Sequence, residues 1–231
     1  MFTFLEHHGA LRVTGSPAWR TVVGGSRAYV ERAAKELTAT ELSTPVRAVS
    51  RNGAGIDVRD DSDGVRTFDA AVVATHADDA LRLLAEPTAR ERATLGAFRS
   101  AANETILHTD GSLLPRRRRA RASWNYLLDR CASDAADVHV SYDMNRLHRL
   151  HEPLDYVVTL NPGGRIAEDA VLARMRYTHP VFTSDTVVAQ ATLPALNDGR
   201  IAFAGAYHGW GFHEDGCLAG VRAAASLGVD W

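Results

Sequence analysis

The sequence predicts a mixed α/β fold in which a β-rich block interrupts an α/β domain. Near the start, short alternating apolar runs are separated by turn signals, and residues 104–160 hold four more strand-like runs. From residue 198 onward the pattern returns to a strand, a glycine-rich loop and a helix. This order is expected when a β-rich domain is inserted into an α/β domain.

Bulk composition excludes some classes of protein. The chain has 231 residues, of which 45% are hydrophobic and 23% charged, with a net charge of -2. These values predict a globular protein without a general affinity for nucleic acid. The two cysteines, Cys131 and Cys217, match no metal-ligand spacing, and neither a membrane span nor a signal peptide is visible. We therefore expect a cytoplasmic protein with at most peripheral membrane contact.

The first 38 residues combine helical patterns with a glycine pair. Met1–His8 reads as the middle of a helix without a cap, which suggests a missing upstream segment. Arg27–Thr38 has apolar residues at helical spacing, and Ser26 is the expected N-cap after Gly24-Gly25.

A three-stranded antiparallel meander is expected next. Its strands are Val46–Val49, Ile56–Val58 and Val65–Phe68, with a turn signal at Asn52-Gly53. Ala70–Thr75 lacks polar alternation, which predicts a strand buried on both faces. Helical patterns follow at 77–84 and 88–98, and the strand-like runs of the central block lie at 105–108, 124–128, 138–142 and 156–160. The central block is expected to form one mixed sheet.

A cationic cluster lies inside this block. It consists of Arg116, Arg117, Arg118, Arg119 and Arg121. Such a run is either a solvated loop or a patch for an anionic surface, such as lipid headgroups or a phosphate-bearing partner.

The most informative stretch is Phe203–Gly220. A buried strand, Arg200–Gly205, enters a glycine-rich loop that opens a helix at Gly216, so that unpaired N–H groups there would attract an electron-rich ligand. Tyr207, Trp210 and Phe212 offer stacking surface. The alternative is an ordinary strand–loop–helix crossover whose glycines permit tight packing.

These motifs together resemble the flavin-containing amine oxidases, and more narrowly a bacterial subgroup of predicted FAD-binding proteins. The segments that carry the resemblance are Trp19–Val22 with Gly24–Ser26, Pro45–Val49, Val72–Thr75, Leu107–Asp110, Ser123–Tyr126, Ser141–Leu147, Leu160–Pro162, Tyr177–Phe182 and Phe203–Gly216. The resemblance covers nearly the whole chain, but the family's opening G-x-G-x-x-G fingerprint is missing. The chain therefore resembles a truncated member, a split gene product or a remnant.

The resemblance implies a two-domain, FAD-binding Rossmann-like fold with an inserted β-rich substrate domain. The implied division is 1–38 as a remnant leading into the FAD domain, 39–87 as part of that domain, 88–197 as the substrate-binding domain and 198–231 as the C-terminal FAD-binding segment. Val46 would meet the adenine, and Ala74 and Thr75 the pyrophosphate or ribose. Gly205, Glu214 and Asp215 would approach the ribityl chain, and the amides of Gly216 and Cys217 the flavin.

Three side chains near this loop are the candidate catalytic residues: His213, with a structural or surface role as the alternative, and Tyr207 and Trp210, with core packing as the alternative. No metal set stands out, since the acidic turn Asp60–Asp63 lacks a downstream glutamate.

The implied function is hydride transfer from an amine or acyl-chain substrate to FAD, with reoxidation by oxygen or another acceptor. The alternative is a non-catalytic fragment, or a subunit that completes a separately encoded FAD-binding half.

Overall fold

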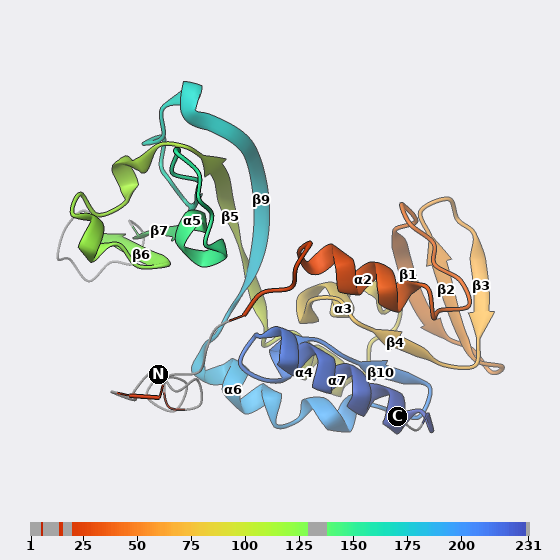
Figure 1. Cartoon of the computed structure of the whole chain (residues 1–231). Coiled ribbons are helices and arrows are strands. Elements are labelled where there is room, and N and C mark those ends of the chain that lie inside the picture. The colour runs from red at the N-terminus through yellow and green to blue at the C-terminus, as the bar shows by residue number, and fades with distance from the viewer. Residues whose placement is uncertain (1–5, 7–13, 16–19, 129–137, 230–231) are drawn as a thin grey trace. The chain divides into compact units, whose positions relative to one another are not determined.

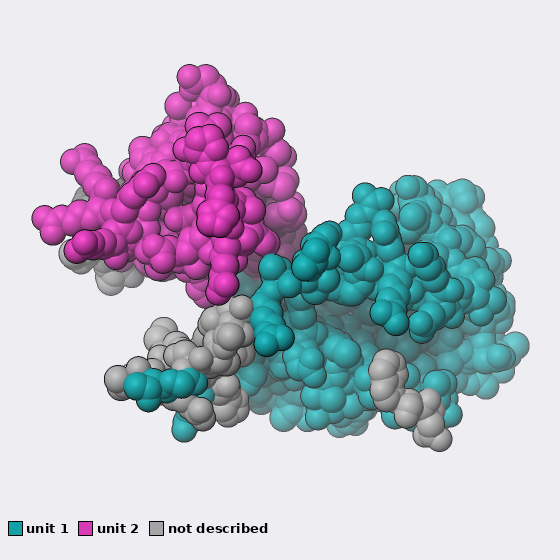
Figure 2. All heavy atoms as spheres, viewed as in Figure 1, with its two compact units in different colours: residues 1–99, 180–231 teal, residues 100–179 magenta. Residues whose placement is uncertain are grey.

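The computed structural model describes residue 6 and residues 14–15, 20–128 and 138–229. It divides the chain into two compact units (Figure 2): unit 1 is Met1–Arg99 with Pro180–Trp231, and unit 2 is Ser100–His179. Helices account for 32% and strands for 28%, which confirms the mixed fold. Residues 88–99 and 180–197, assigned from sequence to the β-rich domain, lie in unit 1. The predicted helix at Met1–His8, the motif residue Trp19 and Cys131 fall outside the described residues, apart from Glu6.

Helix α2 (Ser26–Ala34) forms where the sequence predicts a helix, but its ends differ. Ser26 is the first helical residue and makes no capping hydrogen bond, so its prediction as the N-cap is wrong. The N-cap is Gly25, whose φ of 77° is a conformation that glycine adopts without strain. No side chain of α2 is buried, so packing does not extend the helix to Thr38 as predicted.

The predicted meander is confirmed. Strands β1 (Val46–Arg51), β2 (Ile56–Asp60) and β3 (Val65–Phe68) pair antiparallel in that order. The Asn52 side chain closes the first turn by accepting from the N–H groups of Ala54 and Gly55, at 2.7 and 2.6 Å. This is the turn chemistry that the Asn-Gly signal predicts.

Strands β4 (Ala71–Val73) and β10 (Ile201–Phe203) form a parallel pair. All of β10 is buried, but Val72 of β4 is 43% exposed, so the prediction of a strand buried on both faces is wrong for β4. Val72 lies beside Ala202 in the sheet, and helix α7 (His213–Ser226) packs over Ala202. Ala202 clusters with Ala219 and Ala223 of α7, whereas Val72 belongs to neither described hydrophobic cluster of unit 1.

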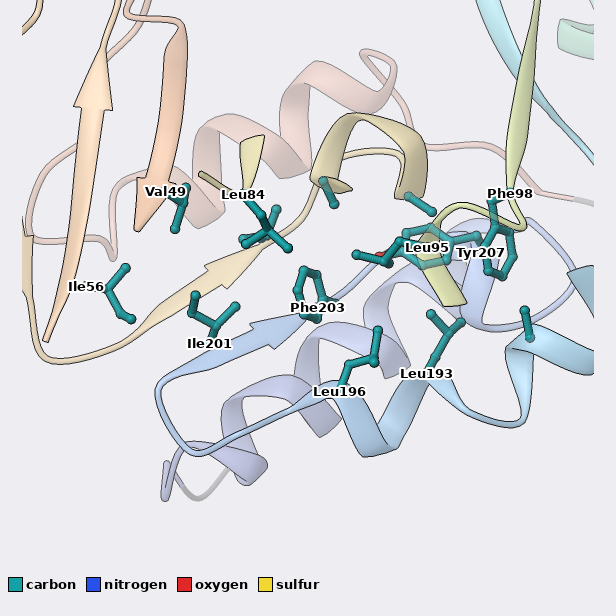
Figure 3. Packing of buried hydrophobic residues seen from close by; sticks show 14 residues of the cluster. Val49, Ile56, Leu84, Leu95, Phe98, Leu193, Leu196, Ile201, Phe203 and Tyr207 are labelled. Atoms are coloured by element: carbon teal, nitrogen blue, oxygen red, sulfur yellow. The ribbon is translucent and has the colours of Figure 1, made fainter. Parts of the chain in front are cut away.

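The hydrophobic core of unit 1 lies among β1, β2, β4, β10 and four helical segments (Figure 3). These are α3 (Ala77–Leu83), α4 (Ala89–Leu95), α6 (Ser184–Gln190) and the 3-10 turn η5 (Leu193–Leu196). The predicted helices at 77–84 and 88–98 are confirmed. Thr88 and Glu91 form a capping box at the start of α4, which explains locally why the helix begins there.

One ion-pair network connects separate elements of unit 1. Arg51, at the end of β1, reaches Glu91 of α4 at 2.6 Å and Asp198 ahead of β10 at 2.7 Å. Glu91 is only 2% exposed, and its other oxygen accepts from the Thr88 N–H at 2.7 Å. The two carboxylates raise the pKa of Arg51 against the lowering effect of burial.

Unit 2 is built on a five-stranded sheet in the order β6–β7–β8–β5–β9. The strands are β5 (Arg99–His108), β6 (Trp124–Leu128), β7 (Val138–Asp143), β8 (Val157–Leu160) and β9 (Val171–Val181), and helix α5 (Met144–His148) follows β7. The four predicted strands are confirmed, and β6–β7, β7–β8 and β8–β5 pair antiparallel. The sequence reasoning missed β9, because an edge strand with mostly exposed side chains shows no apolar alternation.

The two faces of this sheet differ in character. One face buries polar side chains: His108 Nε2 lies 2.8 Å from the Thr159 hydroxyl, which lies 2.9 Å from that of Ser141. The other face carries two apolar rows from strand to strand. The first row is Trp124, Tyr142, Val158 and Leu107, and the second is Tyr126, Val140 and Leu160. Of these seven, Trp124 and Tyr126 are exposed and the rest are half-buried.

Candidate functional site

The carboxyl ends of β4 and β10 bring three predicted cofactor residues together. The Ala204 N–H donates to Val73 O at 3.1 Å, which aligns the two strand ends. The next residues are Ala74 and Thr75 on one side and Gly205 on the other, and a Cβ placed on Gly205 would lie 3.5 Å from Thr75 O. Ala74 and Thr75 are exposed. Ligands of α/β sheets bind outside the carboxyl ends of their strands, so this edge is the candidate cofactor site.

Helix α7 begins three residues earlier than the sequence predicts. Its first residue is His213, so the Gly216 N–H is already used within the helix and donates to Phe212 O at 3.1 Å. The prediction that the helix opens at Gly216 is therefore wrong. The N–H groups that lead the helix belong to His213, Glu214 and Asp215, and the positive end of the helix dipole lies there.

Asp215 organises the loop before α7. Its Oδ2 accepts from the N–H groups of Trp210 at 3.0 Å and Phe212 at 2.9 Å. Asp215 is a predicted cofactor-binding residue, and one of its carboxylate oxygens is therefore already hydrogen-bonded to the backbone of this loop. Glu214 and His213, next to it in the first turn, are exposed.

The sequence reasoning missed Gln190 at the end of α6. Its side-chain Nε2 donates to Tyr207 O at 2.9 Å and to Gly209 O at 2.7 Å, so one amide holds two carbonyls of the glycine-rich loop. No local pattern could have identified this residue, because the contact joins positions 17 and 19 residues apart.

Tyr207 lies in the core of unit 1. Its side chain is 4% exposed, and its ring meets that of Phe98 edge-on at 5.3 Å (Figure 3). Burial raises the pKa of the Tyr207 phenol, and its hydroxyl has no hydrogen-bond partner among the described residues. The next residue, His208, has its pKa lowered by burial and by the charge of Arg222.

The remaining predicted site residues lie on the surface. Trp210 is 52% exposed, Val46 at the start of β1 is 39% exposed, and Cys217 is an exposed free cysteine. Val46 lies in the three-stranded sheet rather than in the β4–β10 pair, so no described contact joins it to Thr75 or Gly205.

A cluster of possible metal ligands follows Thr75. His76, Asp78 and Asp79 offer ligand atoms within 4.8 Å of one another. Arg82 forms ion pairs with both aspartates, so its guanidinium offsets one of their two negative charges. Among the described helices, none is long and apolar enough to cross a membrane.

Comparison with known proteins relates this chain to a protein family. Residues 1–115 match the family model of flavin containing amine oxidoreductases. No curated protein matches the sequence.

The fold matches solved structures of two kinds. A putrescine oxidase with redesigned cofactor binding has a TM-score of 0.58 and 14% identity, over 89% of this chain and 53% of that one. Wild-type putrescine oxidase bound to putrescine has a TM-score of 0.55 and 13% identity, over 89% of this chain and 52% of that one. A CLA-producing fatty acid isomerase from P. acnes has a TM-score of 0.56 and 12% identity, over 84% of this chain and 50% of that one. The chain thus spans about half the length of each of these proteins.

The family match and the shared fold confirm the resemblance seen in the sequence and indicate a flavin cofactor, FAD. We therefore assign the chain, through residues 1–115, to the flavin containing amine oxidoreductase family.

Proposed function

We propose that this chain is part of an FAD-dependent oxidoreductase that transfers hydride from an amine or an acyl-chain substrate to the flavin. The observation that carries the proposal is the meeting of Thr75 and Gly205 at the ends of two parallel strands, beside the start of α7. When bound, FAD would supply the hydride acceptor.

The residues present suit a flavin nucleotide. A Cβ on Gly205 would lie 2.4 Å from the Tyr207 ring, so this glycine lets the ring pack against the strand end, and the site of a Cβ on Gly216 lies 3.7 Å from Ala206 N. The leading N–H groups of α7 would favour negative charge. Thr75, Gly205 and the first turn of α7 would hold the cofactor, while Asp215 and Gln190 position the loop between them.

Unit 2 would bind the hydrocarbon part of the substrate. Its inner strands β8 and β5 present the apolar row Val158, Leu160 and Leu107 on one sheet face, outside the described hydrophobic cluster of this unit. An apolar surface of this kind binds a hydrocarbon chain by removing it from water. This apolar row suits the hydrocarbon part of an alkyl amine as well as that of an acyl chain.

The first test is a visible absorption spectrum of the purified chain after incubation with FAD and desalting. We expect retained flavin bands. Ala74→Glu would weaken retention by placing a negative charge beside the expected pyrophosphate position, and the matched change Ala173→Glu, at an exposed alanine of β9, would not. A colourless wild-type chain would contradict FAD binding by this chain alone.

A second candidate is a subunit that completes a separately encoded FAD-binding half. Helix α2 supports it, because none of its side chains is buried while Tyr29 and Val30 are 45% and 54% exposed. The preceding Val23 is 94% exposed. Exposed apolar side chains gathered on one segment mark an interaction surface.

This candidate predicts that FAD is retained only when a dinucleotide-binding half is supplied as a separate chain. Val30→Glu would abolish that joint retention, whereas Val187→Glu, at a valine of α6 that is 62% exposed, would leave it intact. Retention by the isolated chain, unaffected by Val30→Glu, would exclude the subunit role.

A further inference from the structure

Strand β6 forms one edge of the sheet in unit 2 and exposes an apolar stripe. Trp124, Tyr126 and Leu128 alternate along the strand and are 61%, 67% and 45% exposed. Asn125, between them, is buried on the opposite face, where its Nδ2 donates to Ala122 O at 2.7 Å. The buried Asn125 therefore fixes the register of β6, and the apolar side chains remain on the exposed face of the sheet.

The stripe continues onto strand β7. Trp124, Tyr126 and Leu128 lie opposite Tyr142, Val140 and Val138, and the rings of Trp124 and Tyr142 meet edge-on at 5.7 Å. The hydrophobic cluster of unit 2, centred on Ile106, Leu113 and Ile166, involves none of these six side chains. The edge therefore presents a mixed aromatic and aliphatic surface two strands wide.

Four arginines precede this edge. Arg116–Arg119 lead into and form part of the turn η2 (Arg118–Ala120), and residues 121–123 connect this turn to β6 (Figure 1). All four are exposed, and none forms an ion pair with another described residue. Arg121, in contrast, donates to Asp155 at 2.8 Å and to Pro115 O at 3.1 Å, which ties the loop to the unit.

The charged and apolar parts of this edge lie close together. Trp124 lies five positions after Arg119, so the chain allows at most about 17–18 Å between their Cα atoms. We propose that the arginine–aromatic edge, Arg116–Arg119 with Trp124, Tyr126 and Leu128, binds a membrane surface containing anionic phospholipid.

Each part of the edge matches a layer of such a surface. Guanidinium groups pair with phosphate headgroups, and each arginine near the membrane raises affinity by roughly fivefold. Trp and Tyr side chains favour the headgroup boundary, where the ring is half immersed and its polar atom stays hydrated. Leu128 and the valines of β7 would contact the outer hydrocarbon.

A nucleic acid fits this edge less well. Single-stranded nucleic acid is bound by successive aromatic platforms in a positively charged groove. Here aliphatic side chains, Leu128, Val138 and Val140, make up half of the surface.

The test is co-sedimentation of the full chain with phosphatidylcholine vesicles, with and without phosphatidylglycerol, at low and high salt. We expect binding only with phosphatidylglycerol and weakening by salt. Replacing the four arginines by glutamine (R116Q, R117Q, R118Q and R119Q together) should lower the partition coefficient by roughly a hundredfold or more.

The matched control removes the same charge from unit 1. R59Q, R90Q, R92Q and R99Q together replace four exposed arginines without a described ion pair, and this variant should sediment almost as the unmodified chain does. A second variant, W124A with Y126A, should lose binding while keeping the circular dichroism spectrum, because both side chains are exposed.

Several results would overturn the proposal. They are equal binding to neutral and anionic vesicles, equal loss in the two fourfold variants, or tighter binding to a single-stranded oligonucleotide than to the vesicles. None of these measurements involves FAD, so they remain separate from the test of the proposed oxidoreductase.

Discussion

Gly209 and Asp215 are fitted to each other: a Cβ on Gly209 would lie 2.2 Å from Oδ1 of Asp215. The Cβ and Cγ of Asp215 would also lie within 3 Å of this added Cβ, so Asp215 leaves no space for a side chain at position 209. The carboxylate that fills this space also accepts from the N–H groups of Trp210 and Phe212. The loop in front of α7 is therefore closed by one side chain that needs a glycine beneath it.

Gly209→Ala should destabilise unit 1 by about 1–3 kcal/mol, because the added methyl group displaces the Asp215 carboxylate. Chemical denaturation measures the change. The double variant Gly209→Ala with Asp215→Ala should lose less than the sum of the two single variants, since the clash is removed together with the carboxylate. Strict additivity would contradict the fit.

Gln190→Glu should weaken the glycine-rich loop more than Gln190→Ala does. The glutamate replaces an Nε2 donor by an acceptor that faces the carbonyls of Tyr207 and Gly209. Loss of the amide leaves the two carbonyls without this hydrogen-bond donor, which should lower the free energy of unfolding by about 1–3 kcal/mol. Hydrogen exchange of the loop amides, compared between the two variants, distinguishes repulsion from simple loss. Equal exchange in both would count against this role.

Glu91→Gln should lower the free energy of unfolding by about 2 kcal/mol, because Arg51 loses its buried ionic partner. The capping bond from the Thr88 N–H can still form to the amide oxygen, so α4 is retained. Denaturation with urea measures the loss. As a control, Glu31→Gln removes an exposed partner of Arg27 and should change stability by less than about 0.5 kcal/mol.

Stability should fall as the pH drops from about 7.5 to about 5.5. Burial lowers the pKa of His108, against the charge of Asp110, and burial and Arg222 lower that of His208. Below the unfolded histidine pKa of about 6.5, the unfolded chain binds protons that the folded chain does not, so this contribution to stability is lost.

The measurement is urea denaturation at both pH values. His208→Gln should reduce the slope, whereas His151→Gln, at an exposed position, should leave it unchanged. A slope that is the same in all three proteins would rule out His208 as a contributor.

The Asn52-Gly53 turn and the Thr88–Glu91 cap show what local sequence determines. Both act through hydrogen bonds between residues two or three positions apart, so the meander and the start of α4 could be predicted correctly. The same holds for buried β10, whose apolar run is continuous. The family resemblance likewise rests on motifs in order along the chain, and the family match confirms it.

The start of α7, the exposure of Val72 and the roles of Gln190 and strand β9 were decided by tertiary structure. The Asp215 carboxylate joins two loop N–H groups to the first turn, which moves the start of the helix back to His213. Val72 is exposed, although its partner Ala202 in the sheet packs against α7. The sequence by itself therefore determined most helices and strands and the family resemblance, because short-range hydrogen bonds and apolar periodicity depend only on residues close together in the chain. Burial and long-range hydrogen bonds depend on which elements meet, and only the folded arrangement decides that.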